Sequence, residues 1–174
     1  MTKAKPIPDG YHTATPYLIA DDAAKAIEFY KKAFGASEKL RIPAPGGRIG
    51  HAEIQIGDSL IMLADEHPEI GALGPRRIGG SPVSIMLYVE DVDRVVERAL
   101  AAGAKLLRPV QDQFYGDRSG TLADPAGHIW HVGTHKEDLS LEEIKRRGEG
   151  SENDPSNRRG PGANCRHVGT TTAR

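Results

Sequence analysis

An internal repeat limits this 174-residue chain more than any other feature. The segment Leu18–Ala20 followed by Asp22 recurs as Leu87–Val89 followed by Asp91, 69 residues later, and a Gly-Ala pair follows each copy after a helix-length stretch. Both copies have the pattern strand, helix, strand, strand, strand. A single unit of this kind leaves one face of its sheet uncovered, so the repeat predicts two modules that share a core or a cleft.

In the first copy, periodicity and turn residues predict each element. Asp22 is the predicted N-cap of a helix over Ala23–Phe34, whose apolar residues recur at helical spacing, and Gly35 ends it. Residues 51–56 alternate polar and apolar, as a strand with one covered face does, and a Gly-Asp hairpin turn follows. The other predicted strands are Thr15–Ala20, Ser37–Ile42 and Ser59–Ala64, and Asp65–Gly80 is a predicted loop.

The second copy gives a helix capped by Asp91 and running to Ala102, with a tight turn at Asp124–Gly127. Its predicted strands are Ser84–Val89, Ala104–Val110, Gly120–Ala123 and Ile129–Gly133. After it, residues 137–147 hold a short helix with a capping box at Ser140. Residues 148–174 are poor in large apolar groups and are predicted to be a disordered tail that includes Cys165.

Composition excludes several classes of function. The 23 basic and 24 acidic side chains give a net charge of −1 without a basic stripe, which argues against a nucleic-acid partner. No apolar run is long enough to cross a membrane, and one cysteine permits no intrachain disulfide. We therefore expect a soluble, cytoplasmic protein. No glycine-rich phosphate loop, serine elbow or HExxH pair supports a nucleotide-dependent or hydrolytic enzyme.

Three stretches, together with the repeat, resemble the glyoxalase/bleomycin-resistance/extradiol-dioxygenase (vicinal oxygen chelate) superfamily. They are AIEFYKKAFGA at 26–36, GHAEIQIGDSLIMLADE at 50–66 and YGDRSGTLADPAGHIWHV at 115–132. The resemblance implies an α+β fold over residues 10–136, in which two βαβββ modules, about 12–67 and 81–136, form a cup-shaped mixed sheet. One fold of this kind supports many chemistries, so the resemblance does not name a reaction.

In metal-dependent members of the superfamily, ligands lie on the first and last strands of each module. The resemblance places these positions on Thr15 and Ser84, on Met62 (or Leu63) and on His131. His131 alone is a competent ligand for a divalent metal, and a catalytic site generally needs three. We therefore expect no metal cofactor.

Other candidates face the predicted cleft. His51 and Glu53 share one side of a strand. Either they line the cleft, where they could form an irregular metal or acid–base site with His131, or they belong to a polar strand face exposed to solvent. Arg118 either binds an anion or makes a structural ion pair. Trp130, with His128, is expected in the core. The predicted ligand-binding set is Thr15, Tyr17, His51, Glu53, Met62, Ser84, Met86, Tyr88, Tyr115, Arg118 and His131, with no catalytic residue assigned.

These observations predict a metal-free protein that binds a small organic molecule, with sequestration of an antibiotic or xenobiotic as one form of that function. A homodimer is expected. Two alternatives stay open. One is a metal-dependent lyase, isomerase or dioxygenase with ligands drawn from His51, Glu53 and His131. The other is a subunit with an assembly role only, whose cleft is filled by its partner.

Overall fold

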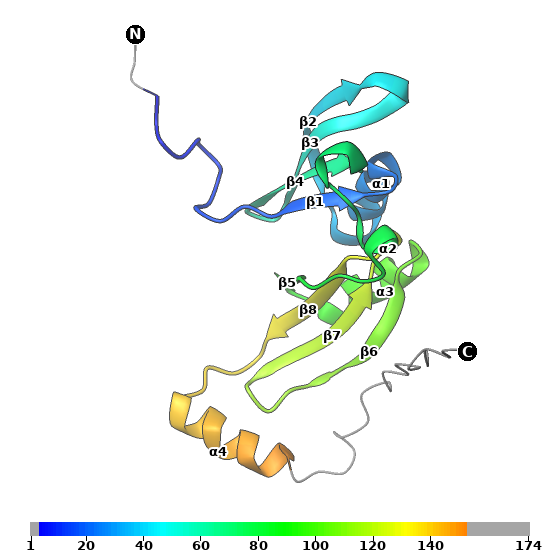
Figure 1. Cartoon of the computed structure of the whole chain (residues 1–174). Helices are drawn as coiled ribbons and strands as arrows, with labels where there is room; N and C mark the ends of the chain where they lie inside the picture. Colours follow the sequence, from blue (N-terminus) through cyan, green and yellow to red (C-terminus); the bar gives the residue numbers. More distant parts are fainter. Residues whose placement is uncertain (1–3, 153–174) are drawn as a thin grey trace, which may run out of the picture.

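The computed structural model describes residues 4–152, which form two four-stranded mixed sheets, each with one long helix (Figure 1). The order of elements repeats, as the sequence predicts, and the α+β class with two βαβββ modules is confirmed. Module one contains β1 (Tyr17–Ala20), α1 (Ala23–Phe34), β2 (Ser37–Ala44), β3 (Arg48–Ile56) and β4 (Ser59–Asp65). Module two contains β5 (Ser84–Tyr88), α3 (Val92–Ala101), β6 (Lys105–Asp112), β7 (Asp117–Ala123) and β8 (Ile129–His135).

The two sheets have the same topology. The strand orders are β1-β4-β3-β2 and β5-β8-β7-β6, with the first strand of each module parallel to the last and the other pairs antiparallel. The first strand is therefore an edge strand in both sheets. Tyr17 and Met86 occupy equivalent positions in the two copies of the repeat. Tyr17 lies opposite Met62 and Met86 lies opposite His131, so Met62 rather than Leu63 is the counterpart of His131.

Both long helices begin where the sequence predicts. The carboxylate of Asp22 accepts a hydrogen bond from the Lys25 backbone N–H at 3.0 Å, and Asp91 does the same for Arg94 at 3.0 Å. Gly35 ends α1 with φ 71°, a left-handed conformation that costs glycine little.

Several predicted boundaries differ from the structure. β7 begins at Asp117, so Asp117 and Arg118 belong to a strand rather than a loop, because pairing with β8 continues to His135. The connection between modules is not all loop: it contains the short helices η2 (Pro68–Ile70) and α2 (Pro75–Ile78). Another short helix, η1 (Pro45–Gly47), connects β2 to β3.

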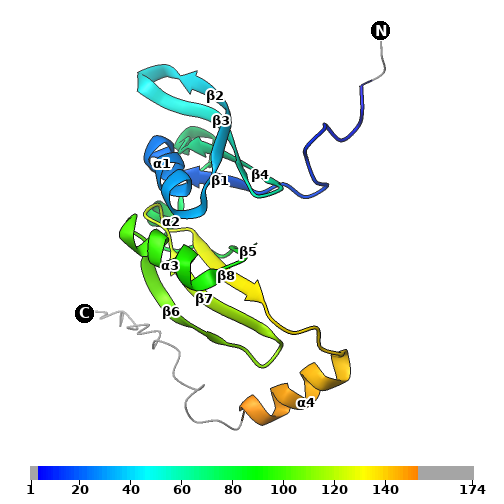
Figure 2. The ribbon, with the colours of Figure 1, turned by 180° about the vertical axis from the view of Figure 1, so that it is seen from behind.

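The C-terminal helix is longer than predicted. α4 spans Leu141–Glu152 and lies beyond sheet two, away from α1 and α3 (Figures 1 and 2). Its predicted cap is present, since the Ser140 hydroxyl accepts from the Glu143 N–H at 3.2 Å. The remainder of the predicted tail, including Cys165, lies outside the described residues.

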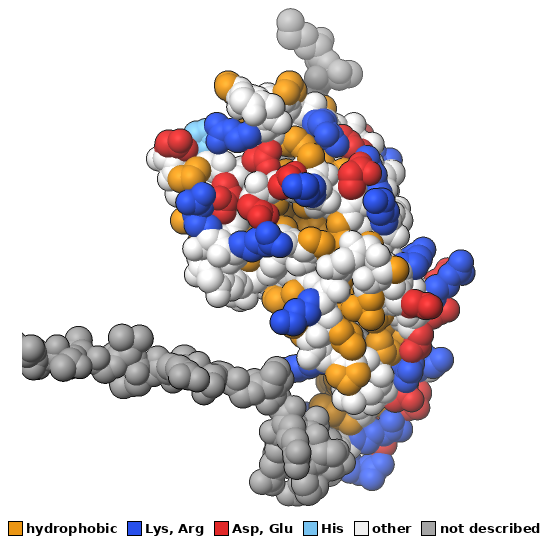
Figure 3. Space-filling view, turned by 90° about the vertical axis from the view of Figure 1, so that its right-hand side faces the viewer, with side chains coloured by type: hydrophobic (Ala, Val, Ile, Leu, Met, Phe, Trp, Pro, Cys, Tyr) orange, Lys and Arg blue, Asp and Glu red, His pale blue; other side chains and the backbone are white. Residues whose placement is uncertain are grey.

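The shared core lies on the helix side of both sheets. α1 and α3 pack against each other, and the fully buried Trp130 of module two contacts Tyr30 and Phe34 of α1, with ring centroids 5.4 Å and 4.8 Å apart. An aromatic cluster therefore joins the modules. Seen from the right-hand side of Figure 1, acidic and basic side chains alternate over the surface, with apolar patches between them (Figure 3).

We call the face of each sheet opposite its helix the outer face. The outer faces keep large apolar side chains exposed: Tyr17, Leu40 and Ile42 on sheet one and Met86 and Tyr88 on sheet two are 40–61% exposed. Within the described part of the chain, no helix is long and apolar enough to span a membrane.

Candidate functional site

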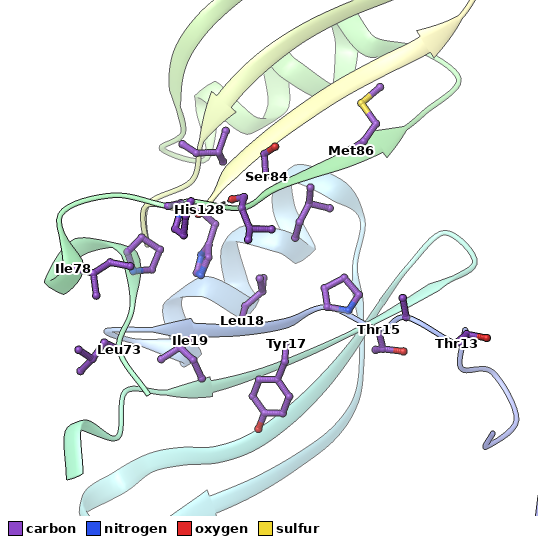
Figure 4. A pocket seen from close by; sticks show the side chains of 18 residues that line it. Thr13, Thr15, Tyr17, Leu18, Ile19, Leu73, Ile78, Ser84, Met86 and His128 are labelled. Carbon is purple, nitrogen blue, oxygen red and sulfur yellow. Dashed lines mark hydrogen bonds between the residues drawn. The ribbon is translucent and has the colours of Figure 1, made fainter. Parts of the chain in front are cut away.

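A cavity lies at the seam where the edge strands β1 and β5 approach each other without pairing (Figure 4). We call it the seam pocket. It has a volume of about 830 Å³, within the range of pockets that hold drug-sized ligands. Its lining is mostly apolar and comes from the approach to β1, from the connection between the modules, from β5 and from the start of β8.

Four residues of the predicted ligand-binding set line the seam pocket. Thr15 and Tyr17 come from the β1 side, and Ser84 and Met86 come from β5. In Figure 4, Tyr17 projects from β1 away from β5, while Ser84 and Met86 project from β5 away from β1. The pocket therefore lies between the two strands rather than between the outer faces, which turn away from each other.

His128 lines the same pocket, although the sequence interpretation placed it in the core with Trp130. It is buried, as predicted, but its ring projects into the gap between β5 and β1 (Figure 4). Its Nδ1 is buried without a hydrogen-bond partner among the described residues. The sequence feature that could have indicated this position is that His128 directly follows the Asp124–Gly127 turn. The turn brings the histidine back beside Asp124.

Asp124 is the polar centre behind the pocket. Its Oδ2 accepts from the Tyr30 hydroxyl at 2.6 Å and from Trp130 Nε1 at 2.9 Å, and its Oδ1 accepts from the His128 backbone N–H at 2.9 Å. His128 Nδ1 lies 3.3 Å from Oδ2, within ion-pair range. One buried carboxylate thus links both modules to the histidine of the pocket.

The environment of Asp124 keeps it ionised. Burial by itself raises the pKa of this carboxyl, but the contacts with His128 and the hydrogen bonds from Tyr30 and Trp130 outweigh that effect and lower it. Desolvation, followed by the nearby Asp124 charge, raises the pKa of Tyr30 well above its usual value. Tyr30 therefore remains a neutral hydrogen-bond donor.

A second predicted group lies on the outer face of sheet one. The Tyr17 hydroxyl is 2.9 Å from His51 Nδ1, and His51 Nε2 is 3.2 Å from Glu53 Oε1. A hydrogen bond from Tyr11, together with that of His51, lowers the pKa of Glu53. Met62 lies opposite both Tyr17 and Glu53 in the sheet. The structure thus brings together the predicted His51–Glu53 pair, with Tyr17 beside it.

A third group lies on the outer face of sheet two. His131 Nδ1 is 2.9 Å from the Thr121 hydroxyl, and the Tyr88 hydroxyl donates to Asp117 Oδ2 at 2.9 Å. Tyr115, near the start of β7, is 3.3 Å from the Ser119 hydroxyl. These residues belong to a different sheet from His51 and Glu53, so one described chain does not gather the predicted set at a single cleft.

Arg118 lies apart from all three groups. Its Nε and Nη2 each donate to the Asp93 carboxylate of α3 at 2.8 Å, and Nη1 reaches Asp112 at 3.2 Å. These carboxylates raise the pKa of its guanidinium. The sequence leaves two roles open for Arg118, anion binding and a structural ion pair. The arrangement fits the ion pair, because the Asp93 carboxylate already occupies the two donors that would bind an anionic ligand.

The described residues include no group of three or more His, Cys, Asp or Glu side chains placed to hold a metal ion. His51 and Glu53 are adjacent on sheet one, while His131 lies on sheet two with Thr121 as its neighbour.

Comparisons with known proteins agree with the fold. A protein of Mycobacterium bovis is 43% identical over 134 residues, which cover 75% of this chain and 88% of that protein. Among solved structures, TioX from Micromonospora sp. ML1 is 28% identical over 70% of this chain and 98% of its own, with a TM-score of 0.55. The fosfomycin resistance protein FosX from Listeria monocytogenes is 21% identical over 76% and 97%, with a TM-score of 0.57, and shares the fold.

The family model described as Glyoxalase/Bleomycin resistance protein/Dioxygenase superfamily matches residues 11–132, which extend from the approach to β1 into β8 and include every residue that lines the seam pocket. This chain therefore belongs to the glyoxalase/bleomycin-resistance/dioxygenase superfamily.

Proposed function

We propose that this protein binds a small organic molecule in the seam pocket and does so without a metal ion. The observation that carries the proposal is the cavity itself: about 830 Å³, mostly apolar, and bounded by both modules. Pockets of this size with few polar groups bind organic ligands through burial of apolar surface, while the polar groups fix orientation. Similarity to a fosfomycin resistance protein is compatible with sequestration of an antibiotic or another xenobiotic.

A neutral, environment-sensitive fluorophore tests this proposal. We expect Prodan to bind saturably with a blue-shifted emission, because the pocket lining excludes water. Ile78 lines the pocket and is 52% exposed, so Ile78→Glu introduces a charge at the pocket without disturbing the core. The variant is expected to weaken binding about tenfold or more, since an unpaired carboxylate must be desolvated by the ligand.

Ile70→Glu is the matched control. Ile70 belongs to the same connection between the modules, is 77% exposed and does not line the seam pocket. Its substitution should leave Prodan binding unchanged. Equal binding by wild type and Ile78→Glu, or no saturable binding by the wild type, would contradict the proposal.

The alternative function is metal-dependent lyase, isomerase or dioxygenase chemistry with His51, Glu53 and His131 as ligands. The separation of these residues on two sheets argues for the binding function. Elemental analysis of the purified protein separates the two. We expect substoichiometric metal, whereas stoichiometric metal that His131→Ala removes would establish the alternative.

We also propose that the protein is a homodimer joined through the outer faces. Exposed aromatic and aliphatic side chains on both sheets form the kind of surface that proteins usually cover. Charged groups on the two faces support this pairing: Glu53 lies opposite Leu40 on sheet one, and the exposed Arg108 lies opposite Thr121 on sheet two, where the carboxylate of Asp117 is buried against Tyr88 and His135. A second copy that pairs sheet one with sheet two brings opposite charges together.

Sedimentation equilibrium tests the homodimer. Leu40 is 41% exposed on the outer face of sheet one, and Leu40→Glu is expected to shift the protein from dimer to monomer. Leu100→Glu is the matched control: Leu100 is 39% exposed on α3, on the helix side of sheet two, and this variant should remain dimeric. A wild-type protein that stays monomeric at all accessible concentrations contradicts this proposal.

A further inference from the structure

We propose that the seam pocket selects an apolar molecule with one acidic head group, a carboxylic acid, and holds it as a carboxylate against His128. This inference rests on the proposed function and assigns the chemical class of its ligand. Among the described residues that line the pocket, His128 is the one group that gains a positive charge on protonation; the others are aliphatic side chains, prolines, hydroxyl groups, Met86 and the phenol of Tyr17.

The position of His128 is the first support. Its side chain is 9% exposed, and Nδ1 lies 3.3 Å from Asp124 Oδ2 without the alignment of a hydrogen bond. Nε2, on the opposite side of the ring, makes no hydrogen bond or ion pair among the described residues. Figure 4 places the ring among the apolar lining residues, between β5 and β1. Buried polar groups usually have a hydrogen-bond partner, so an imidazole nitrogen without one at an apolar pocket indicates a place for a polar group of a ligand.

The surrounding charges favour an imidazolium there. Asp124 is an ionised carboxylate fixed by Tyr30 and Trp130, so a positive ring next to it gains an ion pair. Tyr30 is neutral, and the guanidinium of Arg76, on the neighbouring α2, is paired with Asp21 at 3.1 Å. An anion at Nε2 completes a row of carboxylate, imidazolium and ligand anion, in which each charge has an opposite neighbour.

The proton balance follows from this arrangement. A ligand that arrives as the neutral acid loses its O–H proton to Nε2, and no other bond is made or broken. A ligand that arrives already ionised binds together with one proton that His128 takes from water. Binding of a carboxylate is therefore expected to be coupled to proton uptake, of at most one proton, at a pH where the free ring is neutral. Affinity should fall as the pH rises.

Isothermal titration calorimetry with two isosteric probes tests the proposal on the full-length protein. We expect p-isopropylbenzoate to bind at least about tenfold more tightly than p-isopropylbenzamide at pH 6.5, because the ionic hydrogen bond forms with the carboxylate alone. Repeating the titration at pH 8.5 in buffers with different ionisation enthalpies should report proton uptake. His128→Gln should remove the preference and the proton uptake, while His67→Gln, in an exposed turn, should change neither.

The outcomes separate this inference from the proposed function. Saturable binding of both probes with equal affinity and no proton uptake overturns the acidic head group and leaves the seam pocket as a ligand site. Absence of binding by both probes and by Prodan overturns the proposed function as well. If His128→Gln does not fold, the proton uptake of the wild type alone decides the question.

Discussion

Asp124 shows how much one side chain contributes to both stability and function. Three donors from two modules converge on its carboxylate, and His128 lies beside it at the pocket. A buried group with several partners is costly to remove, because each partner is left without a hydrogen bond. The residue that anchors the pocket histidine is therefore also one that joins the modules.

Asp124→Ala should lower the free energy of unfolding by about 3 kcal/mol or more, since the Tyr30 hydroxyl, the Trp130 indole N–H and a backbone N–H lose their acceptor. Urea unfolding followed by Trp130 fluorescence measures the change. Tyr30→Phe, which removes a single donor, should cost about 1 kcal/mol. Equal stabilities of Asp124→Ala and the wild type would show that this carboxylate does not hold the modules together.

His135 should make stability depend on pH in the neutral range. Its hydrogen bonds to Asp117 at 2.7 Å and to Asp138 at 3.1 Å raise its pKa in the folded protein. A raised folded-state pKa means that the stabilisation is fully present below the unfolded value of about 6.5 and is lost as pH rises through the folded value.

Urea midpoints at about pH 6 and pH 8.5 test this prediction. The wild type should have the lower midpoint at the higher pH, and His135→Gln should reduce the difference. A wild-type midpoint that rises between these two pH values would reverse the assigned sign.

At the scale of elements, local signals predicted helices better than strand ends. Asp22 and Gly35 fix the bounds of α1 by short-range chemistry, so periodicity and caps are sufficient. The sequence predicts strand β7 only from Gly120, whereas β7 begins at Asp117. Pairing with β8 makes residues 117–119 part of the strand, and no pattern within 115–119 reveals the partner.

Removing either helix cap should cost about the same. Asp22 and Asp91 occupy equivalent places in the repeat and each accepts a hydrogen bond at 3.0 Å. Asp22→Ala and Asp91→Ala should each lower the free energy of unfolding by about 1 kcal/mol. The double variant should lose the sum, measured by urea unfolding. A clearly larger loss in the double variant would mean that the caps act through the packing of α1 on α3.

At the scale of the molecule, the arrangement of the modules decides the site. The alternation of side chains predicts one cleft for these residues, but in the structure Tyr17 lies with Glu53 on one outer face and Met86 lies with His131 on the other. It did not reveal how one sheet is oriented to the other, because that depends on the packing of Trp130 against α1. The eleven predicted residues are therefore divided between the seam pocket and two outer faces, and Arg118 is in an ion pair.

The same packing predicts that neither module is stable alone. Tyr30 and Phe34 of α1 are 0% and 8% exposed, and Trp130 of module two covers both. A fragment of residues 10–80 should lack a cooperative urea transition by circular dichroism, because it loses this cover and the contact with α3. A sigmoidal transition like that of the intact chain would show that module one folds independently.

Methyl-selective NMR during titration with p-isopropylbenzoate tests the central claim, the seam pocket as the ligand site, most directly. The isoleucines Ile19, Ile85 and Ile129 line that pocket, while Ile42 reports on the outer face of sheet one and Ile61 on the core. The account predicts saturable shifts at the three seam methyl groups and small changes at the other two. Saturable shifts centred on Ile42, with the seam methyl groups unmoved, would contradict it.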